Sequence, residues 1–230
     1  MKSTNIFMKG HWEDLIMTTF EIDEAILKPY LPKDTQLDLY NGKTLLSMVA
    51  FRFTKVRFFG FNVLMHQNFG QINFRFYVKS KIDNSKGVVF IKEFAPKPLI
   101  TWVANIFYNE PYHFKNITYN KYLKNKKIAL EYNYKTYKTK AKGSVTTHEL
   151  TSNTLEHFVV ARYIAFINNK DNKTLQYKIQ HKPWRLYNLE NSYYDKELLN
   201  LLPKPFKKLK YISTCFVNGS SVAVEKGKIQ

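Results

Sequence analysis

The chain has 230 residues, of which 44% are hydrophobic, 16% aromatic and 23% charged, and this composition excludes a disordered polyelectrolyte and a collagen-like repeat. A chain of this length can bury a sizeable core, and we expect a single domain over residues 1–230. The formal net charge of +18 makes nucleic acid and anionic surfaces partners that have to be weighed.

The first predicted elements are a short helix and four strands. Asp23 is placed to cap a helix over residues 24–27. Asn41-Gly42 is the strongest two-residue hairpin signal, and it should join the first two strands. The four expected strands are rich in β-branched and aromatic residues and cover 36–40, 43–56, 71–81 and 87–94.

The second half alternates helices and strands. Pro98 is well placed to begin a helix with an apolar stripe. Asn153 and Glu156 resemble a capping box, which predicts a helix over 153–166, and a short helix is expected over 195–201. The expected strands lie within 112–150, with turns at Lys124-Asn125 and Lys142-Gly143, at 175–181 and 184–189, and around Ile212 and Val222. This order predicts an α+β fold with a mainly antiparallel curled sheet or β-barrel and a few peripheral helices.

Lysine supplies most of the positive charge. Only five of the 36 basic residues are arginine, the side chain that base edges and phosphates prefer for its planar fork. The densest lysine clusters alternate with Tyr, Leu or Phe, as half-exposed strands do. We therefore favour a solubilising surface over a nucleic-acid interface, and a Lys-rich polyanion-binding protein is kept as a lower-ranked alternative.

Several common sites are not expected. No segment approaches the roughly 20 apolar residues that cross a bilayer, and the N-terminus lacks the apolar region of a signal peptide, so we expect a cytoplasmic protein without a membrane partner. The single cysteine, Cys215, is expected to be a small buried hydrophobe. The six histidines show no metal-ligand spacing, and we predict neither a metal nor another cofactor.

Residues 69–78 show an alternation with two interpretations. On a strand, one face would carry the polar side chains Gln71, Asn73, Arg75 and Tyr77. The other face would be wholly apolar. If the apolar face meets the core, the polar face is solvated. If the strand belongs to a closed barrel, the polar row lines a cavity and Arg75 can bind an anion.

Lys97 lies between Pro96 and Pro98 at a predicted strand-to-helix junction. A lysine held at a rigid, partly buried junction can have a lowered pKa and attack a carbonyl group. With 31 lysines in the chain, exposure to solvent is the competing interpretation. Glu93, four residues earlier, either pairs with Lys97 or faces water. A third unusual segment, 181–186, is expected to form a structural corner with His181 beside Trp184.

Over almost its full length the chain resembles the YqjF-like family, domain of unknown function 2071. The matching motifs occur in the family's order and are His11-Trp12-Glu13, Leu31-Pro32, Asp38-x-Tyr40-x-Gly42, residues 69–78, Gly87-Val88-Val89-Phe90, Pro111-Tyr112, Leu155-Glu156 with Arg162-Tyr163, and His181-x-Pro183-Trp184-x-Leu186. The resemblance implies the acetoacetate decarboxylase-like superfamily, with a curled antiparallel sheet around a pocket and association into homo-oligomers.

Within that resemblance, Ala95-Pro96-Lys97 is similar to the decarboxylase motif, so Lys97 would take the Schiff-base position and Gln71 the position of a carboxylate. Our first hypothesis is a small-molecule ligand bound by Gln71, Asn73, Arg75 and Tyr77, with Glu93 and Lys97 at one end. The second is a Schiff-base lyase in which Lys97 and Glu93 are catalytic. Whether the chain is an enzyme is left open by its residues.

Overall fold

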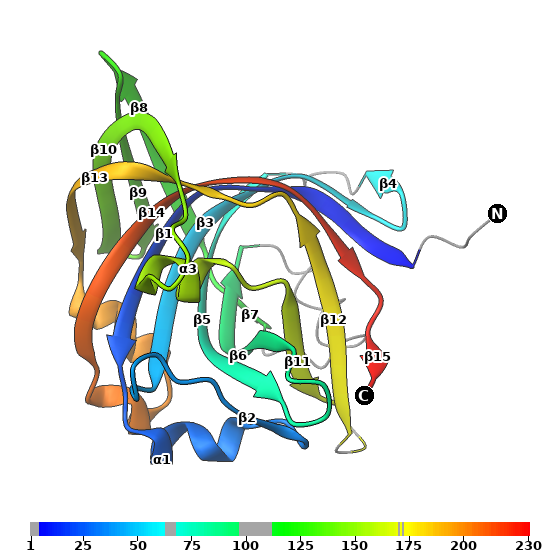
Figure 1. Ribbon diagram of the computed structural model, residues 1–230. Coiled ribbons are helices and arrows are strands. Elements are labelled where there is room, and N and C mark those ends of the chain that lie inside the picture. The colour runs from blue at the N-terminus through cyan, green and yellow to red at the C-terminus, as the bar shows by residue number, and fades with distance from the viewer. Residues whose placement is uncertain (1–4, 63–67, 97–111, 170, 172) are drawn as a thin grey trace.

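The computed structural model describes residues 5–62, 68–96, 112–169, 171 and 173–230 (Figure 1). Its strands form one sheet whose main path runs β15-β12-β11-β6-β5-β3-β1-β14-β13-β10-β9-β8. Nearly all described pairings are antiparallel, and the parallel ones join β6 to β7 and to β11. The sheet curls until β12 also pairs with β14, without closing into a regular barrel. The predicted fold class is confirmed.

The longest strands form the centre of the sheet and are β1 Ile6–Glu21, β3 Leu45–Phe58, β5 Phe69–Ser80, β6 Lys86–Ala95 and β14 Lys210–Glu225. The other strands are β2 Thr35–Leu37, β4 Phe61–Asn62, β7 Tyr112–Phe114, β8 Ile117–Lys124, β9 Lys127–Tyr134, β10 Tyr137–Glu149, β11 Ile164–Asn168, β12 Thr174–His181, β13 Arg185–Tyr194 and β15 Lys228–Ile229. The described helical segments are α1 Glu24–Leu27 and α3 Leu155–Val160, with 3-10 turns η1 Lys28–Tyr30, η2 Lys196–Leu201 and η3 Lys204–Lys207.

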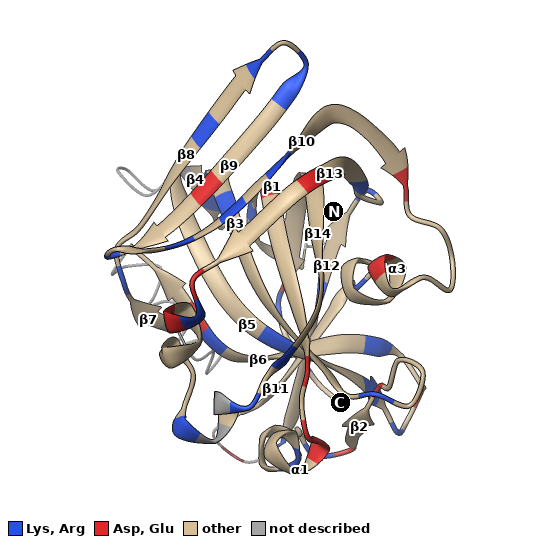
Figure 2. Cartoon of the chain, turned by 90° about the vertical axis from the view of Figure 1, so that its left-hand side faces the viewer, with Lys and Arg blue, Asp and Glu red and all other residues tan. Residues whose placement is uncertain are grey.

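The centre of the sheet is covered on both faces. On one face, here the helix side, Tyr77 of β5 packs on Phe158 of α3 with ring centroids 5.1 Å apart. On the opposite face, here the arm side, Phe74 belongs to the same buried cluster as Leu130 of β9. The arm is the β8–β9–β10 extension that projects from the molecule in Figures 1 and 2. Because β5 lies between the two layers, both sets of its alternating side chains are buried.

The helix cap and the tight turn predicted in the first half of the chain are confirmed. The Asp23 side chain accepts a hydrogen bond from the Ala25 amide at 2.9 Å and caps α1. Asn41 and Gly42 form a tight turn in which both residues have positive φ, 48° and 74°. The pairing predicted around this turn is wrong, because only the bridge between Tyr40 and Lys43 closes it. The preceding strand β2 pairs with the end of β5 instead.

Three predictions in the second half are corrected by tertiary pairing. The predicted turn at Lys142-Gly143 is a register shift inside β10, where a Cβ on Gly143 would lie 2.1 Å from the Asn188 carbonyl oxygen of β13. The two closing strands predicted around Ile212 and Val222 are the single strand β14. The short helix predicted over 195–201 is the 3-10 turn η2.

The helix predicted over 153–166 is much shorter. Thr154, and not Asn153, is its N-cap, and the Thr154 hydroxyl accepts a hydrogen bond from the His157 amide at 3.2 Å. The helix ends at Val160, and Phe166 belongs to β11, which pairs with β12. The apolar spacing fits a helix, but strand pairing decides the structure of its second half. The helix predicted from Pro98 lies outside the described residues.

Candidate functional site

A buried polar row runs along the helix side of β5. It consists of Gln71, Asn73, Arg75 and Tyr77, and all four side chains are buried. The interpretation of this row as a solvated face is therefore wrong. Burial of four polar side chains on one strand is costly unless they find partners, so their contacts determine what the row can do.

The two neighbouring strands supply partners to the row. Glu93 of β6 lies opposite Asn73, and it is itself buried. The Gln71 side-chain amide donates a hydrogen bond from Nε2 to Glu93 Oε2 at 2.8 Å. At the other end, the Tyr77 hydroxyl and Ser47 Oγ of β3 are hydrogen-bonded at 2.6 Å. Burial raises the pKa of Tyr77, so its hydroxyl stays protonated.

Arg75 is the charged member of the row. Its Nη2 donates a hydrogen bond to the Val159 carbonyl oxygen of α3 at 2.9 Å. In the described part of the chain no carboxylate forms an ion pair with Arg75, and its buried Nε has no hydrogen-bond partner there. Burial lowers the pKa of this guanidinium, whereas Tyr77 and, more weakly, the Glu93 carboxylate oppose that shift. Arg75 is thus a desolvated cation whose described hydrogen-bond partners are neutral, and Glu93 is the carboxylate that acts on it without forming an ion pair.

Asn73 is the second residue with an unmet polar atom. Its Oδ1 is buried and has no hydrogen-bond partner among the described residues. Asn73 and Arg75 are two positions apart on the strand and therefore point to the same side. Asn73 and Arg75 keep 5% and 6% of their surface accessible, while Asn73 Oδ1 and Arg75 Nε are themselves buried. The two side chains together offer an acceptor and a cation to a polar ligand.

Arg162, another buried arginine, has the carboxylate partner that Arg75 does not have among the described residues. Its Nη1 donates to Asp38 Oδ2 at 2.7 Å, and its Nε donates to the Phe158 carbonyl oxygen at 2.7 Å. The guanidinium also lies over the Tyr77 ring, 5.2 Å from its centroid. Arg162 is held by its own contacts, and it fixes the aromatic end of the polar row.

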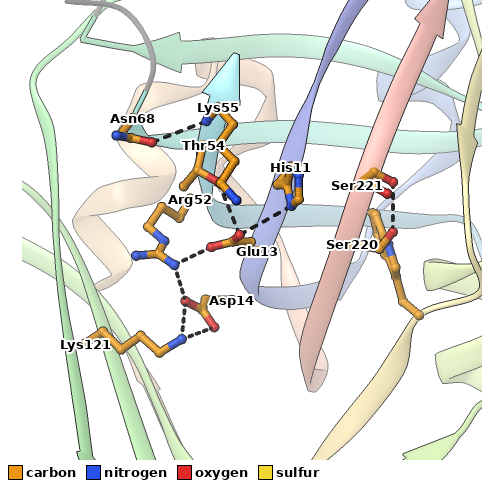
Figure 3. Close-up of polar contacts among 11 residues, drawn as sticks. His11, Glu13, Asp14, Arg52, Thr54, Lys55, Asn68, Lys121, Ser220 and Ser221 are labelled. Atoms are coloured by element: carbon orange, nitrogen blue, oxygen red, sulfur yellow. Dashed lines mark hydrogen bonds and ion pairs between the residues drawn. The ribbon is translucent and has the colours of Figure 1, made fainter. Parts of the chain in front are cut away.

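A second polar cluster lies on the arm side and was missed by sequence reasoning (Figure 3). Asp14 has a φ of 60° at an irregularity between β1 and β3, where its carboxylate binds Lys121 and lies 3.5 Å from Arg52. Glu13 pairs with the same arginine. Two anions meet two cations, so the cluster neutralises itself and joins the arm to the sheet. In the sequence, the two adjacent acids Glu13 and Asp14 directly before an apolar segment were the feature that could have indicated this cluster.

The remaining predicted site residue, Lys97, lies outside the described residues. The structure brings Glu93 and the four polar residues of β5 together on one side of the sheet, as the ligand hypothesis requires. The predicted corner is also present, since the His181 ring stacks on Trp184 with centroids 4.1 Å apart. Among the described residues no group of three or more His, Cys, Asp or Glu side chains is arranged to bind a metal ion. None of the helices in the described ranges is long and apolar enough to span a membrane.

Comparison with known proteins agrees with the resemblance drawn from the motifs. The family named domain of unknown function 2071 (DUF2071), described as an uncharacterized conserved protein, matches residues 9–211. The uncharacterized protein YqjF of Bacillus subtilis (strain 168) is 26% identical over 190 residues, which are 80% of this chain and 76% of that protein.

Two solved structures show the same fold at low sequence identity. Acetoacetate decarboxylase from Legionella pneumophila is 13% identical with a TM-score of 0.66, and the match covers 97% of this chain and 87% of that one. The enduracididine biosynthesis enzyme MppR, complexed with pyruvate, is 8% identical with a TM-score of 0.63, over 96% of this chain and 90% of that one. These likenesses establish the acetoacetate decarboxylase-like fold.

Proposed function

The chain belongs to the DUF2071 family, and we propose that it binds a small organic ligand with a carboxylate or carbonyl group on the helix side of its sheet, beside Arg75. This proposal rests on the charge environment of the Arg75 side chain. Its guanidinium is buried and forms no ion pair among the described residues, although the charge of Glu93 acts on it from the adjacent strand. A buried cation is costly without a counterion, and a ligand carboxylate would supply one through charge-assisted hydrogen bonds.

The neighbouring groups suit the rest of such a ligand. Asn73 Oδ1 can accept a hydrogen bond from a ligand hydroxyl or a protonated carboxyl group. Glu93 on the adjacent strand accepts a hydrogen bond from Gln71, and its carboxylate forms one end of the site. The Tyr77 hydroxyl lies at the other end of the row, hydrogen-bonded to Ser47. The pyruvate bound to MppR, a protein of the same fold, supports a small keto acid as the ligand class.

Calorimetric titration with pyruvate and acetoacetate tests the proposal, with acetone as the uncharged comparison. The wild type should bind the acids and not acetone. Arg75→Gln should weaken the acids by about tenfold or more, because a charge-assisted contact is lost. Arg185→Gln removes the same charge from a partly exposed arginine that pairs with Glu149 of β10, and it should leave the affinity within about twofold. Equal effects of the two variants, or binding of acetone as tight as that of the acids, would overturn the proposal.

Schiff-base chemistry at Lys97 is the alternative activity, and it rests on the resemblance of the Ala95-Pro96-Lys97 motif. Borohydride trapping with acetoacetate, followed by peptide mapping, tests it. A reduced adduct on Lys97 that Lys97→Ala abolishes would support a lyase. A folded protein that binds the acids without an adduct would be a non-covalent binding protein, so the two proposals are separated.

A further inference from the structure

A groove with a volume of about 710 Å³ crosses four adjacent strands, β12, β14, β1 and β3. Sequence reasoning did not identify this groove, because its residues come from distant parts of the chain. The polar and basic residues that line the groove include Lys9, His11, Lys55, Arg57, Lys182 and Ser221. The volume is in the range of pockets that hold small organic ligands.

The strand register explains how this row of side chains is assembled. Lys9 of β1 lies opposite Ala223 of β14 on one side and Arg57 of β3 on the other. His11, two residues after Lys9, lies opposite Ser221. Residues opposite each other in a sheet point to the same face, so long basic side chains stand beside small ones. The groove is hollow because Ala223 and Ser221 are short.

The groove is on the opposite face from the polar row of β5. A Cβ on Gly10 would meet the Phe53 ring at 2.5 Å, which places position 10 on the helix side with that ring. Lys9 and His11 flank Gly10 and therefore point to the other face. Figure 3 shows His11 on β1 next to Ser221 on β14, with Lys55 on the neighbouring strand. The groove is thus a site separate from the one proposed for the carboxylate ligand.

The charge of the groove is one-sided. Four basic side chains line it, and no Asp or Glu belongs to its described lining. Lys9, Lys55 and Lys182 form no ion pair within the described ranges, unlike lysines such as Lys28 and Lys43. Two acids lie near the groove: Glu13 pairs with Arg52 and lies 3.7 Å from His11 Nδ1, and Glu225 accepts a hydrogen bond from Gln180. The four basic side chains outnumber these two acids, so the field in the groove is positive and attracts an anion.

We propose that this groove binds a small organic phosphate. Several cations converge on one hollow, which suits the multiple charges and oxygens of a phosphate group. The Ser221 hydroxyl and the His11 ring add hydrogen-bonding groups for the organic part. Elsewhere, Lys and Arg segments are spread over many elements with Asp and Glu among them (Figure 2). A bounded groove of this size fits a small molecule better than the extended path of a nucleic acid.

Calorimetric titration at low salt with glucose 6-phosphate and inorganic pyrophosphate, with glucose as the uncharged comparison, tests this inference. The wild type should bind both phosphates and not glucose. Lys9→Gln/Lys182→Gln should weaken both by about tenfold or more. Lys124→Gln/Lys142→Gln removes the same charge from exposed positions of the arm and should change the affinities by less than about twofold.

Arg75→Gln serves as a further control, because it should leave phosphate binding unchanged while weakening the keto acids. The inference is overturned if the wild type binds neither phosphate. It is also overturned if the two double variants lose affinity equally, since that result would mean attraction to net charge alone. A single-stranded oligonucleotide tests the alternative of a nonspecific polyanion-binding surface. That alternative is supported if the protein binds the oligonucleotide but neither phosphate, and if both double variants weaken oligonucleotide binding equally.

Discussion

Lys121 and Asp14 are 107 residues apart in the sequence, yet the Lys121 Nζ lies 2.9 and 2.8 Å from the two carboxylate oxygens of Asp14. The Tyr132 hydroxyl also donates to the Asp14 carbonyl oxygen at 2.7 Å. The contacts run from β8 and β9 to β1, so they hold the arm against the sheet. The Asp14 side chain is only 3% exposed, which makes the loss of its cation costly.

We predict that Lys121→Met destabilises the fold by about 2 kcal/mol, because the buried Asp14 carboxylate loses its closest cation and keeps only Arg52, 3.5 Å away. Lys124→Met on the same strand removes an exposed lysine and should cost less than about 0.5 kcal/mol. Urea unfolding followed by tryptophan fluorescence measures both values. Similar costs for the two variants would show that the Asp14 contact does not anchor the arm.

The two buried arginines should respond differently to replacement by methionine. Arg162→Met leaves Asp38 buried with only a lysine at 3.8 Å, so we expect a loss of about 3 kcal/mol. Arg75→Met removes a desolvated charge and leaves Glu93 with its hydrogen bond from Gln71, so we expect a smaller loss of about 1 kcal/mol. The same urea experiment tests the order. A larger loss for Arg75→Met would mean that Arg75 is structural.

Cys215 should be unreactive in the folded protein. Burial raises the pKa of its thiol to about 12, and Glu156 adds to the shift, so the reactive thiolate is rare at pH 8. We expect no labelling by a disulfide reagent until urea unfolds the chain. Leu123→Cys, at a position that is 62% exposed, provides the reactive comparison. Labelling of Cys215 as fast as that of Cys at position 123 would contradict the prediction.

His181 should titrate below the ordinary histidine value. Burial lowers its pKa from 6.5, although the Nδ1 donates to the Lys182 carbonyl oxygen and opposes the shift. The unfolded chain then binds the proton more readily than the folded one. The contribution of His181 to stability is therefore complete above pH 6.5 and is lost as the pH falls from 6.5 towards the lowered pKa.

Proton NMR of the histidine ring signals measures this titration, with His181→Asn to assign the resonance. His113, whose pKa is also lowered by burial and by nearby lysines, should behave with the same sign. A midpoint for His181 at or above 6.5 would refute the expectation.

The cap of α3 should affect both stability and the ligand site. Thr154→Ala removes the acceptor for the His157 amide and should cost about 1 kcal/mol, whereas Thr154→Ser keeps the hydroxyl and should cost much less. Because the Val159 carbonyl oxygen of this helix holds Arg75, keto-acid binding should weaken in the alanine variant as well. Thermal unfolding and calorimetry check the two effects, and equal stability of the Ala and Ser variants would argue against the cap.

Short-range features were predictable from the sequence because they depend on neighbouring residues. The Asp23 cap, the Asn41-Gly42 turn and the alternation of residues 69–78 all act within a few positions of the chain. The helix predicted over 153–166 shows the limit of this reasoning. Its apolar spacing is satisfied by α3 only as far as Val160, and pairing with β12 converts the following residues into a strand.

The candidate sites show the same division. The sequence by itself determined that Gln71, Asn73, Arg75 and Tyr77 share one face of a strand, because side chains alternate along any strand. Only the tertiary structure decided that this face is buried, since α3 covers it and the arm covers the other face. Pairs such as Arg162 with Asp38, and the basic groove across four strands, likewise depend on packing and register between distant segments, which no local pattern specifies.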